Sequence, residues 1–468
     1  MYDVCVVGGG MVGSAAARWL SLKRETRVCL IGPREPTDEE WNSPDREIFG
    51  CHYDEGRITR ELDQDPIWAL LAKRSIERYR DIERESGLKF YEEVGCLFLD
   101  PKGSESNQAC RQTADSLGIK HEILSSGGVH SKFPYLRVKK DTEGIWTPHR
   151  AGFISPRTLV SAQQRIALKN GCRIINDVVV KVAEEHQGVG EGYVKVTTKT
   201  GTEILARRVL LCCGASTNFY HLLPPEKKLD YKSLRTLVVL AEMSATDLSR
   251  FRGMPSIAHW DSYVLPPIKY PDGKHYLKLG LWPNEAEEVA DLSESAAWYR
   301  SHGKGWDLTK TITVFRALVP DLKPVSLVTN CCLTTLTPSG QLYCDMASPR
   351  VGVLACMNGY GAKSSDEIGR MGALMISKGS WNHDLPTETF KLRFKPAKSH
   401  FNDAACREEE EEEEEEEDTL QGIMSPPPSS TSNASQTCIF NKAPSGMSIP
   451  AGYVGVNVTI MAASRLDS

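Results

Sequence analysis

The sequence predicts a mixed α/β fold that combines a parallel, doubly wound sheet with an antiparallel sheet. Residues 2–7 form an apolar run that ends in three glycines. An alanine-rich helical stretch and a second apolar run follow, which is the pattern of a β-α-β unit. A second glycine-terminated strand is expected over residues 208–214. Strand candidates over residues 237–243, 262–267 and 275–281 alternate polar and apolar side chains, which is typical of an antiparallel sheet that covers a ligand.

The remaining elements indicate two interleaved domains, because the β-α-β pattern stops and later resumes. Helices are expected over residues 11–22, 67–86 and 155–170, strands over 27–31, 95–99, 172–182 and 193–198, and two strands, a glycine turn and a helix over 329–377. The pattern favours a discontinuous first domain and an inserted second domain. We expect residues 1–90, 150–220 and 325–390 in the first domain, and residues 91–149 and 221–324 in the second.

Composition excludes several classes of protein. The chain has 468 residues, of which 40% are hydrophobic and 25% charged, the profile of a globular protein. No apolar run reaches the ~18 residues that a membrane helix needs, so no membrane partner is expected. The 14 cysteines are sparse and lie largely in predicted strands, which favours reduced thiols in an intracellular compartment. No paired CxxC spacing suggests a metal site.

An acidic block dominates the formal net charge of −5. Ten consecutive glutamates, Glu408 to Glu417, precede a segment rich in serine and proline, and we expect a disordered tail over residues 400–468. Residues 1–407 carry 54 basic and 49 acidic residues, a formal net charge of +5. This mild excess suits a small anionic ligand and is too weak to indicate nucleic-acid binding.

The glycine turn after the first strand predicts a dinucleotide site. Gly8, Gly10 and Gly13 have the spacing G-x-G-x-x-G, directly after a strand and at the start of a helix, where Ser14 follows. In such a turn the glycines allow close backbone approach to a pyrophosphate, and the helix N-terminus offers its N–H groups to the anion. We therefore expect a Rossmann-like domain. The acid usual at the end of the second strand, which binds a ribose, is replaced by Gly32, and Glu35 is either its substitute or a solvated loop residue.

Four further motifs give the chain a family resemblance. They are Asp54-Glu-Gly-Arg57-Ile-Thr-Arg60, Tyr276-Leu-Lys278-Leu-Gly280, Cys332-Leu-Thr-Thr335-Leu-Thr337-Pro338 and Asn358-Gly359-Tyr360-Gly361-Ala-Lys363-Ser-Ser365. Their order and spacing resemble the monomeric sarcosine oxidase and pipecolate oxidase family, over about residues 1 to 390. The resemblance implies FAD, the D-amino-acid oxidase fold with its antiparallel-sheet substrate domain, and oxidation of secondary amino acids or related amines to an imine with release of hydrogen peroxide.

The resemblance also assigns roles to basic residues. Arg60 and Lys363 resemble the family's clamp for the substrate carboxylate, which fixes the reacting carbon near the flavin. Lys278 resembles the residue that activates oxygen, and its strand neighbours Leu277 and Leu279 would face the other way. For each of these three cations the alternative is an ordinary solvated side chain.

Other positions are expected around the cofactor. Cys332 resembles the cysteine that joins the flavin 8α carbon as a thioether, whereas Cys331, on the opposite strand face, is expected in the core. Arg57 is expected near the flavin, or else paired with Glu55 or another carboxylate. Tyr360 and Ser339 replace a histidine and an aspartate of the family, so a bulkier or cyclic amine is as plausible a substrate as sarcosine. The expected cofactor-binding residues are completed by Val180, Gly214, Gly359 and Gly361.

The function expected is therefore an FAD-dependent amine or amino-acid oxidase. Two alternatives remain open: a flavin-binding protein without turnover that acts through its acidic tail, and an FAD dehydrogenase that passes electrons to a carrier. The expected partners are the substrate and molecular oxygen, and the chain is expected to be a monomer. Ser464-Arg465-Leu466 would resemble a peroxisomal signal only as the last three residues, and two residues follow it. We expect a cytoplasmic location, with the peroxisome as the family-based alternative.

Overall fold

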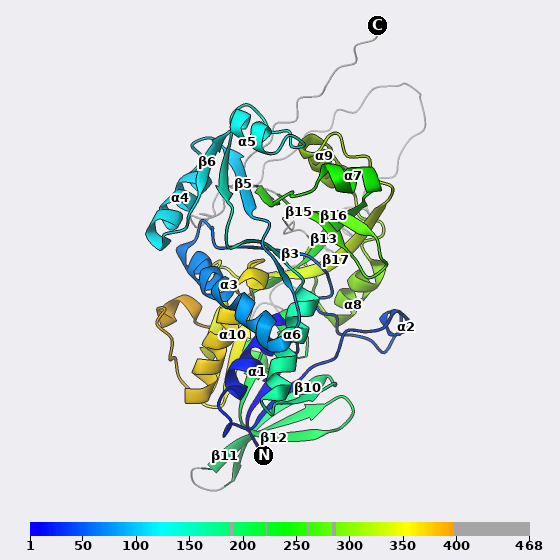
Figure 1. The fold of residues 1–468 in the computed structure, drawn as a ribbon. Coiled ribbons are helices and arrows are strands. Elements are labelled where there is room, and N and C mark those ends of the chain that lie inside the picture. Colours follow the sequence, from blue (N-terminus) through cyan, green and yellow to red (C-terminus); the bar gives the residue numbers. More distant parts are fainter. Residues whose placement is uncertain (188–190, 221, 260–261, 283–286, 397–468) are drawn as a thin grey trace, which may run out of the picture. The chain divides into compact units, whose positions relative to one another are not determined.

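The computed structural model describes residues 1–187, 191–220, 222–259, 262–282 and 287–396, and residues Met1–Lys395 form one unit. Figure 1 shows the arrangement of its elements. The expected disordered tail and the segment Ser464–Leu466 lie outside the described residues. No helix within the described ranges is both long and apolar enough to cross a membrane.

A parallel sheet forms the base of the predicted nucleotide domain. Its parallel strands run in the order β19, β12, β1, β2, β9. They span Val351–Ala355, Glu203–Leu211, Tyr2–Val7, Val28–Ile31 and Arg173–Ile175. An antiparallel hairpin of β10 (Val179–Gln187) and β11 (Glu191–Thr198) extends β12, and β18 (Tyr343–Met346) pairs with β19. The predicted α/β class with a parallel sheet is confirmed.

Four helices provide the framework around this sheet: α1 (Met11–Ser21), α3 (Pro66–Ser86), α6 (Pro156–Lys169) and α10 (Gly361–Lys378). Helix α1 contacts α6 and α10, and α10 also contacts α3. Local sequence sets their ends. The side chain of Asp65 accepts the N–H groups of Ile67 and Trp68 at the start of α3, and Gly87 ends that helix in the left-handed region.

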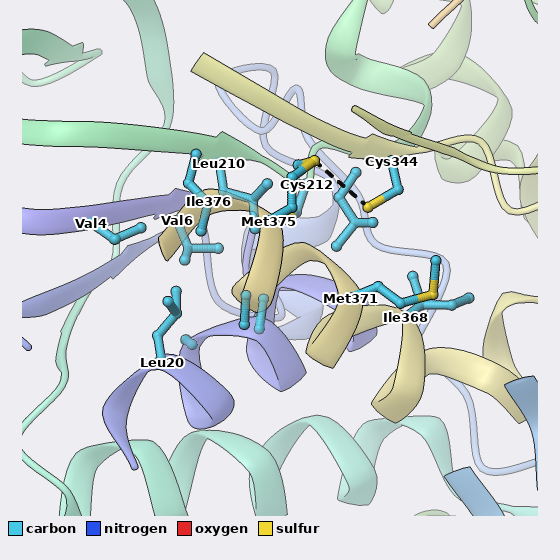
Figure 2. Packing of buried hydrophobic residues seen from close by; sticks show 14 of the residues in the cluster. Val4, Val6, Leu20, Leu210, Cys212, Cys344, Ile368, Met371, Met375 and Ile376 are labelled. Carbon is cyan, nitrogen blue, oxygen red and sulfur yellow. Dashed lines mark hydrogen bonds between the residues drawn. The ribbon is translucent and has the colours of Figure 1, made fainter. Parts of the chain in front are cut away.

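The core between the parallel sheet and the helices is built from alternating strand residues and one face of each helix. Val4 and Val6 of β1 pack with Leu20 of α1 and with Met371 and Met375 of α10 (Figure 2). Burial of this apolar surface stabilises the fold by about 25 cal/mol per Å². It also fixes the N-terminus of α1 and the N-terminus of α10 relative to the sheet.

The second large sheet is mainly antiparallel and has the order β17, β13, β16, β15, β14, β5, β7, β6. Its strands span Leu327–Leu336, Lys232–Glu242, His275–Leu281, Ser262–Lys269, Ser256–His259, Cys96–Pro101, Thr142–Thr147 and Glu122–Ser125. A small third sheet contains β3 (Arg57–Arg60), β8 (Ala151–Ile154) and β4 (Tyr91–Glu92). The shorter helices are α2 (Asp38–Trp41), α4 (Glu105–Leu117), α5 (Ser126–Lys132), α7 (Ala245–Arg250), α8 (Leu292–Ser301) and α9 (Thr309–Leu318).

Three details differ from the sequence-based expectations. The strand expected over residues 172–182 is two strands, because the chain leaves β9 after Ile175 and enters β10 only at Val179. The segment over residues 329–377 contains three strands, β17, β18 and β19, where two were expected. Strand β17 pairs with β13 in the second sheet. The division into two domains and its boundaries stay a prediction.

Candidate functional site

In the glycine turn between β1 and α1, Gly8 and Gly13 leave no space for a side chain. Gly8 has a φ of +111°, and a Cβ atom there would lie 2.3 Å from the carbonyl oxygen of Cys212. A Cβ atom on Gly13 would lie 1.9 Å from the carbonyl oxygen of Gly8. Helix α1 begins after Gly10 with no side-chain cap and no acidic residue in its first turn. Its first N–H groups are therefore suited to an anion.

Polar side chains brace this turn from behind. Ser14 is buried and donates its hydroxyl to the carbonyl oxygen of Gly9 at 3.0 Å. Gln164 of α6 donates to the same oxygen at 3.2 Å and to the Ser14 hydroxyl at 3.1 Å. Neither Gly13 nor Ser14 lines the cavity in front of the turn, so both support the backbone that would contact a pyrophosphate.

The structure explains the glycine at the end of β2. A Cβ atom on Gly32 would lie 2.5 Å from the backbone nitrogen of Gly9, so a larger residue would push the glycine turn away. Glu35 is held by Arg157 through two hydrogen bonds of 2.7 Å, and it does not line the cavity. The Glu35 carboxylate therefore forms an ion pair with Arg157.

A cavity of about 290 Å³ opens in front of the glycine turn. It extends along the ends of β1, β2 and β12 to β17 and to the start of α10. The predicted cofactor residues that line it are Gly8, Gly10, Arg57, Gly214, Cys332, Gly359 and Gly361. Val180 does not line it, whereas its neighbour Val179 does, because successive side chains of a strand point to opposite faces.

Cys332 lines the cavity together with a cysteine that sequence analysis did not single out. Cys331 is buried beside Trp298, whose backbone oxygen accepts its thiol at 3.2 Å. Cys332 and Cys51 both line the cavity. A hydrogen bond from Cys332 lowers the pKa of Cys51 to about 6, and that bond and burial raise the pKa of Cys332. Cys51 is therefore the more acidic of the two thiols at the cavity wall.

Two of the predicted basic residues share one buried carboxylate. Lys278 of β16 pairs with Asp54 Oδ2 and donates to the carbonyl oxygen of Gly56 at 2.8 Å. Arg57 of β3 pairs with the same oxygen and donates to the carbonyl oxygen of Cys51 at 2.8 Å. Burial lowers the pKa of Lys278 to about 8, Arg57 adds to this effect, and Asp54 opposes it. We call Lys278, Asp54 and Arg57 the first triad.

The first triad bears differently on the roles predicted for Arg57 and Lys278. Arg57 lines the cavity and pairs with Asp54, whereas the other candidate partner, Glu55, is bound by Arg157. The Lys278 side chain is 0% exposed and is not part of the cavity wall. Its strand neighbours Leu277 and Leu279 pack into an apolar cluster. The oxygen-activating role of Lys278 stays a prediction.

The other two predicted basic residues share a second buried carboxylate. Lys363, in the first turn of α10, pairs with Asp63 Oδ2, and Arg60 Nη2 lies 3.4 Å from that oxygen. All three residues are buried. The Arg60 Nε atom is buried and has no hydrogen-bond partner among the described residues. Burial lowers the pKa of Lys363 to about 8, against the opposing effect of Asp63. We call Lys363, Asp63 and Arg60 the second triad.

The turn before Lys363 has a constrained backbone conformation. Cys356, Asn358 and Gly359 have φ values of +63°, +48° and +78°, a conformation that non-glycine residues adopt only when contacts hold them. The Asn358 backbone N–H donates to the carbonyl oxygen of Thr335 at 3.0 Å, and its side-chain oxygen accepts the N–H of Thr337 at 2.8 Å. The end of β17 thus fixes the start of α10.

Tyr360 belongs to an aromatic group beside the second triad. Its ring centroid lies 5.2 Å from that of Trp68 and 5.8 Å from that of Trp282. Lys363 Nζ lies 5.1 Å from the Tyr360 ring centroid, a cation–π distance. Tyr360 does not line the cavity. It therefore contributes to the surroundings of Lys363.

Sequence analysis quoted Asp54 within a motif without a role, and it did not single out Asp63. Asp54, Arg57, Arg60 and Asp63 follow one another at intervals of three residues. Arg57 forms an ion pair with Asp54, and Arg60 forms one with Asp63, each over three positions in the sequence. This regular spacing of charge was the available signal. No group of three metal-ligating side chains occurs within the described ranges.

These features define a dinucleotide-binding protein, and the residues that line its cavity suit FAD. The glycine cradle and the uncapped N-terminus of α1 suit the pyrophosphate, and Arg57 and Cys332 line the far part of the same cavity. When bound, FAD would supply the electron acceptor for oxidation of a substrate.

Comparison with known proteins identifies the family. A family model described as FAD dependent oxidoreductase (DAO) matches residues 3–375, and the chain belongs to this family. The predicted membership in the D-amino-acid oxidase superfamily, the dependence on FAD and the assignment as an oxidoreductase are thereby confirmed. N-methyl-L-tryptophan oxidase of Yersinia pestis (strain Pestoides F) is 25% identical over 387 residues, which cover 80% of this chain and 94% of that protein.

Solved structures show the same fold. NikD, described as an unusual amino acid oxidase essential for nikkomycin biosynthesis, matches with a TM-score of 0.63 at 20% identity, and the match covers 85% of this chain and 99% of NikD. Glycine oxidase from Geobacillus kaustophilus matches with a TM-score of 0.61 at 16% identity, over 85% of this chain and 99% of that chain.

Proposed function

We propose that the chain is an FAD-dependent oxidase of secondary amino acids or related amines, which forms an imine and hydrogen peroxide. The observation that carries this proposal is that the two buried triads, each with two cations, lie beside the same cavity. The first triad contributes Arg57 to the cavity wall, and the second triad lies at the start of α10, next to the lining residues Gly361 and Ala362.

The charge of the second triad supports a carboxylate-bearing substrate. Arg60 and Lys363 are cations, and Asp63 is the single anion paired with them in the described part of the chain. The group therefore keeps one net positive charge when Lys363 is protonated, in a buried place where an unpaired charge is costly. A substrate carboxylate would compensate that charge and fix the reacting C–H bond.

The first triad supports reaction with oxygen. Lys278 is a buried cation at neutral pH, because its pKa is about 8. A fixed positive charge in a dry site stabilises negative charge that develops on oxygen as it accepts an electron. We assign Lys278 this role. We assign Cys332 the covalent attachment of the flavin.

One observation favours a second candidate, a dehydrogenase that passes electrons to a carrier. Lys278 is enclosed by Asp54 and Gly56 and does not line the cavity. If the flavin does not come within reach of the Lys278 charge, oxygen would react slowly. The two candidates differ in what consumes the electrons.

The test is an aerobic assay of the purified holoprotein with sarcosine, with the cyclic amino acids pipecolate and proline, and with further N-methyl amino acids, each compared with the corresponding amine that lacks the carboxylate. The oxidase predicts one hydrogen peroxide formed per oxygen consumed with at least one carboxylate substrate. Turnover only with an artificial electron acceptor would favour the dehydrogenase. Equal activity with and without the carboxylate would contradict the carboxylate site.

A further inference from the structure

The end of β2 has no room for the acid that usually binds the adenosine ribose in a dinucleotide fold. That acid accepts hydrogen bonds from the ribose hydroxyl groups. Gly32 stands in its place, where a Cβ atom would lie 2.5 Å from the backbone nitrogen of Gly9. The next acid along the chain, Glu35, is bound by Arg157 and does not line the cavity. A carboxylate for the ribose must therefore come from another element.

Asp177 is the one acidic residue among the described residues that line the cavity. It follows β9, the strand that pairs with β2. The chain after β9 is hydrogen-bonded to the residues after β2. The carbonyl oxygen of Ile175 accepts the N–H of Gly32 at 3.1 Å, and Asn176 Oδ1 accepts the N–H of Arg34 at 2.8 Å. The segment that carries Asp177 is thus attached next to the position that lacks the acid.

Local hydrogen bonds hold the half-buried side chain of Asp177 in place as an anion. Its Oδ1 atom accepts the N–H of Val178 at 2.7 Å, and its Oδ2 atom accepts the hydroxyl of Thr200. Burial acts to raise the pKa of Asp177, but hydrogen bonds from Thr198 and Thr200 outweigh it and lower that pKa. An ionised carboxylate has about four acceptor positions. Acceptor positions therefore remain for a ligand in the cavity.

We propose that Asp177 takes over the role of the missing acid of β2 and accepts hydrogen bonds from the ribose hydroxyl groups of FAD. The inference goes beyond the proposed function, because it concerns the adenosine half of the cofactor and holds for any substrate. The glycine turn and Asp177 line the same cavity. A pyrophosphate at the N-terminus of α1 would leave the adenosine to extend past Gly32 toward Asp177. Because the carboxylate repels a phosphate, the site takes an unphosphorylated ribose.

The experiment measures the dissociation constant of the cofactor from holoproteins that all carry Cys332→Ala, so that no covalent bond masks the equilibrium. Dilution releases free flavin, and its fluorescence gives the bound fraction. The two ligands are FAD and an FAD analogue whose adenosine ribose lacks both hydroxyl groups, exchanged into each holoprotein by dialysis. Asp177→Asn keeps the shape of the side chain and removes its charge. Glu35→Gln is the matched control, because Glu35 is the other acid near the end of β2.

We expect Asp177→Asn to weaken the binding of FAD by about tenfold and to leave the binding of the analogue within about twofold, because only FAD donates hydrogen bonds to the carboxylate. In Glu35→Gln, both ligands should bind within about twofold of the Cys332→Ala parent. The melting temperature establishes that each variant is folded. If Asp177→Asn fails to fold, Thr200→Val decides instead, because loss of the hydroxyl that holds Asp177 should reduce the preference for FAD over the analogue.

Three results would overturn the inference. The first is an unchanged preference for FAD over the analogue in Asp177→Asn, or in Thr200→Val where that variant decides. The second is an equal loss of affinity for both ligands, which would mean that the carboxylate contacts the adenine ring or only supports the local fold. The third is a loss in Glu35→Gln that is confined to FAD, which would assign the ribose to Glu35. None of these results bears on the substrate proposed above.

Discussion

Lys278 and Asp54 form an ion pair in which the two side chains are 0% and 2% exposed. The residues lie 224 positions apart, and the contact joins β16 to the segment before β3. Burial alone acts to raise the pKa of Asp54, but Lys278 and Arg57 outweigh it and hold that pKa well below its usual range. The carboxylate is therefore ionised throughout the neutral range, and it keeps a buried ammonium in a fixed position.

Replacement of Lys278 by methionine should separate the two half-reactions. Methionine fills a similar volume without the charge, so we expect reoxidation of the reduced flavin by oxygen to slow by about 10²-fold or more. Anaerobic reduction by substrate should change little. Stopped-flow absorbance measures both steps, and an unchanged reoxidation rate would remove the role assigned to Lys278.

The same group predicts a pH dependence. Lys278 is protonated below its pKa of about 8 and neutral above it. Reoxidation should therefore be fast at neutral pH and fall as the pH rises through about 8. Because Asp54 raises the pKa of Lys278, Asp54→Asn should shift this fall to lower pH. Rates measured from pH 6 to 10 in both proteins provide the check, and a flat wild-type profile would contradict the assignment.

Covalent attachment of the flavin can be tested by acid precipitation. We expect the yellow colour to remain with the precipitated wild-type protein and to appear in the supernatant for Cys332→Ala. Cys331→Ala is the matched control, because Cys331 is buried in an apolar cluster and should leave attachment unchanged. Release of flavin from the wild type would show that the thioether does not form.

The close packing of the glycine turn predicts that a single added methyl group at Gly13 weakens FAD binding. The added methyl group of Gly13→Ala would lie 1.9 Å from the carbonyl oxygen of Gly8, so the turn must move. Overpacking of this kind costs about 1–3 kcal/mol, which corresponds to a weakening of FAD binding by about 5- to 150-fold. Gly127→Ala, where the nearest atom lies 3.9 Å away, is the control. Equal FAD contents after purification would contradict this account of the turn.

Local patterns were sufficient to predict much of the fold. The β1-α1-β2 unit, the long helix α3 and strand β16 all have strong apolar periodicity or glycine punctuation within a short stretch of sequence. Strand β3 was not predicted because it has four residues and pairs only with β8, which lies far along the chain. Pairing of that kind depends on the tertiary structure.

The glycine turn and Cys332 were predicted from local motifs, whereas of the two triads only the cations were predicted. The motifs identified Arg57, Arg60, Lys278 and Lys363, but the pairing of Lys363 with Asp63 joins residues 300 positions apart. No local rule brings those two side chains together. Val179 lines the cavity and Val180 does not, because successive side chains of a strand point to opposite faces and β10 begins at Val179.

We propose that the cavity between the glycine turn and β17 holds a flavin that accepts electrons from an amine next to the second triad. The most direct measurement is anaerobic titration of the purified holoprotein with sarcosine, pipecolate and N-methyl amino acids, followed by the flavin absorbance. The account predicts that at least one of these compounds bleaches the flavin stoichiometrically, and that Arg60→Gln raises the concentration required by about tenfold or more. The proposal would be contradicted if none of these compounds reduces the flavin. It would also be contradicted if the flavin of the Arg60→Gln variant is reduced at the same substrate concentration as that of the wild type.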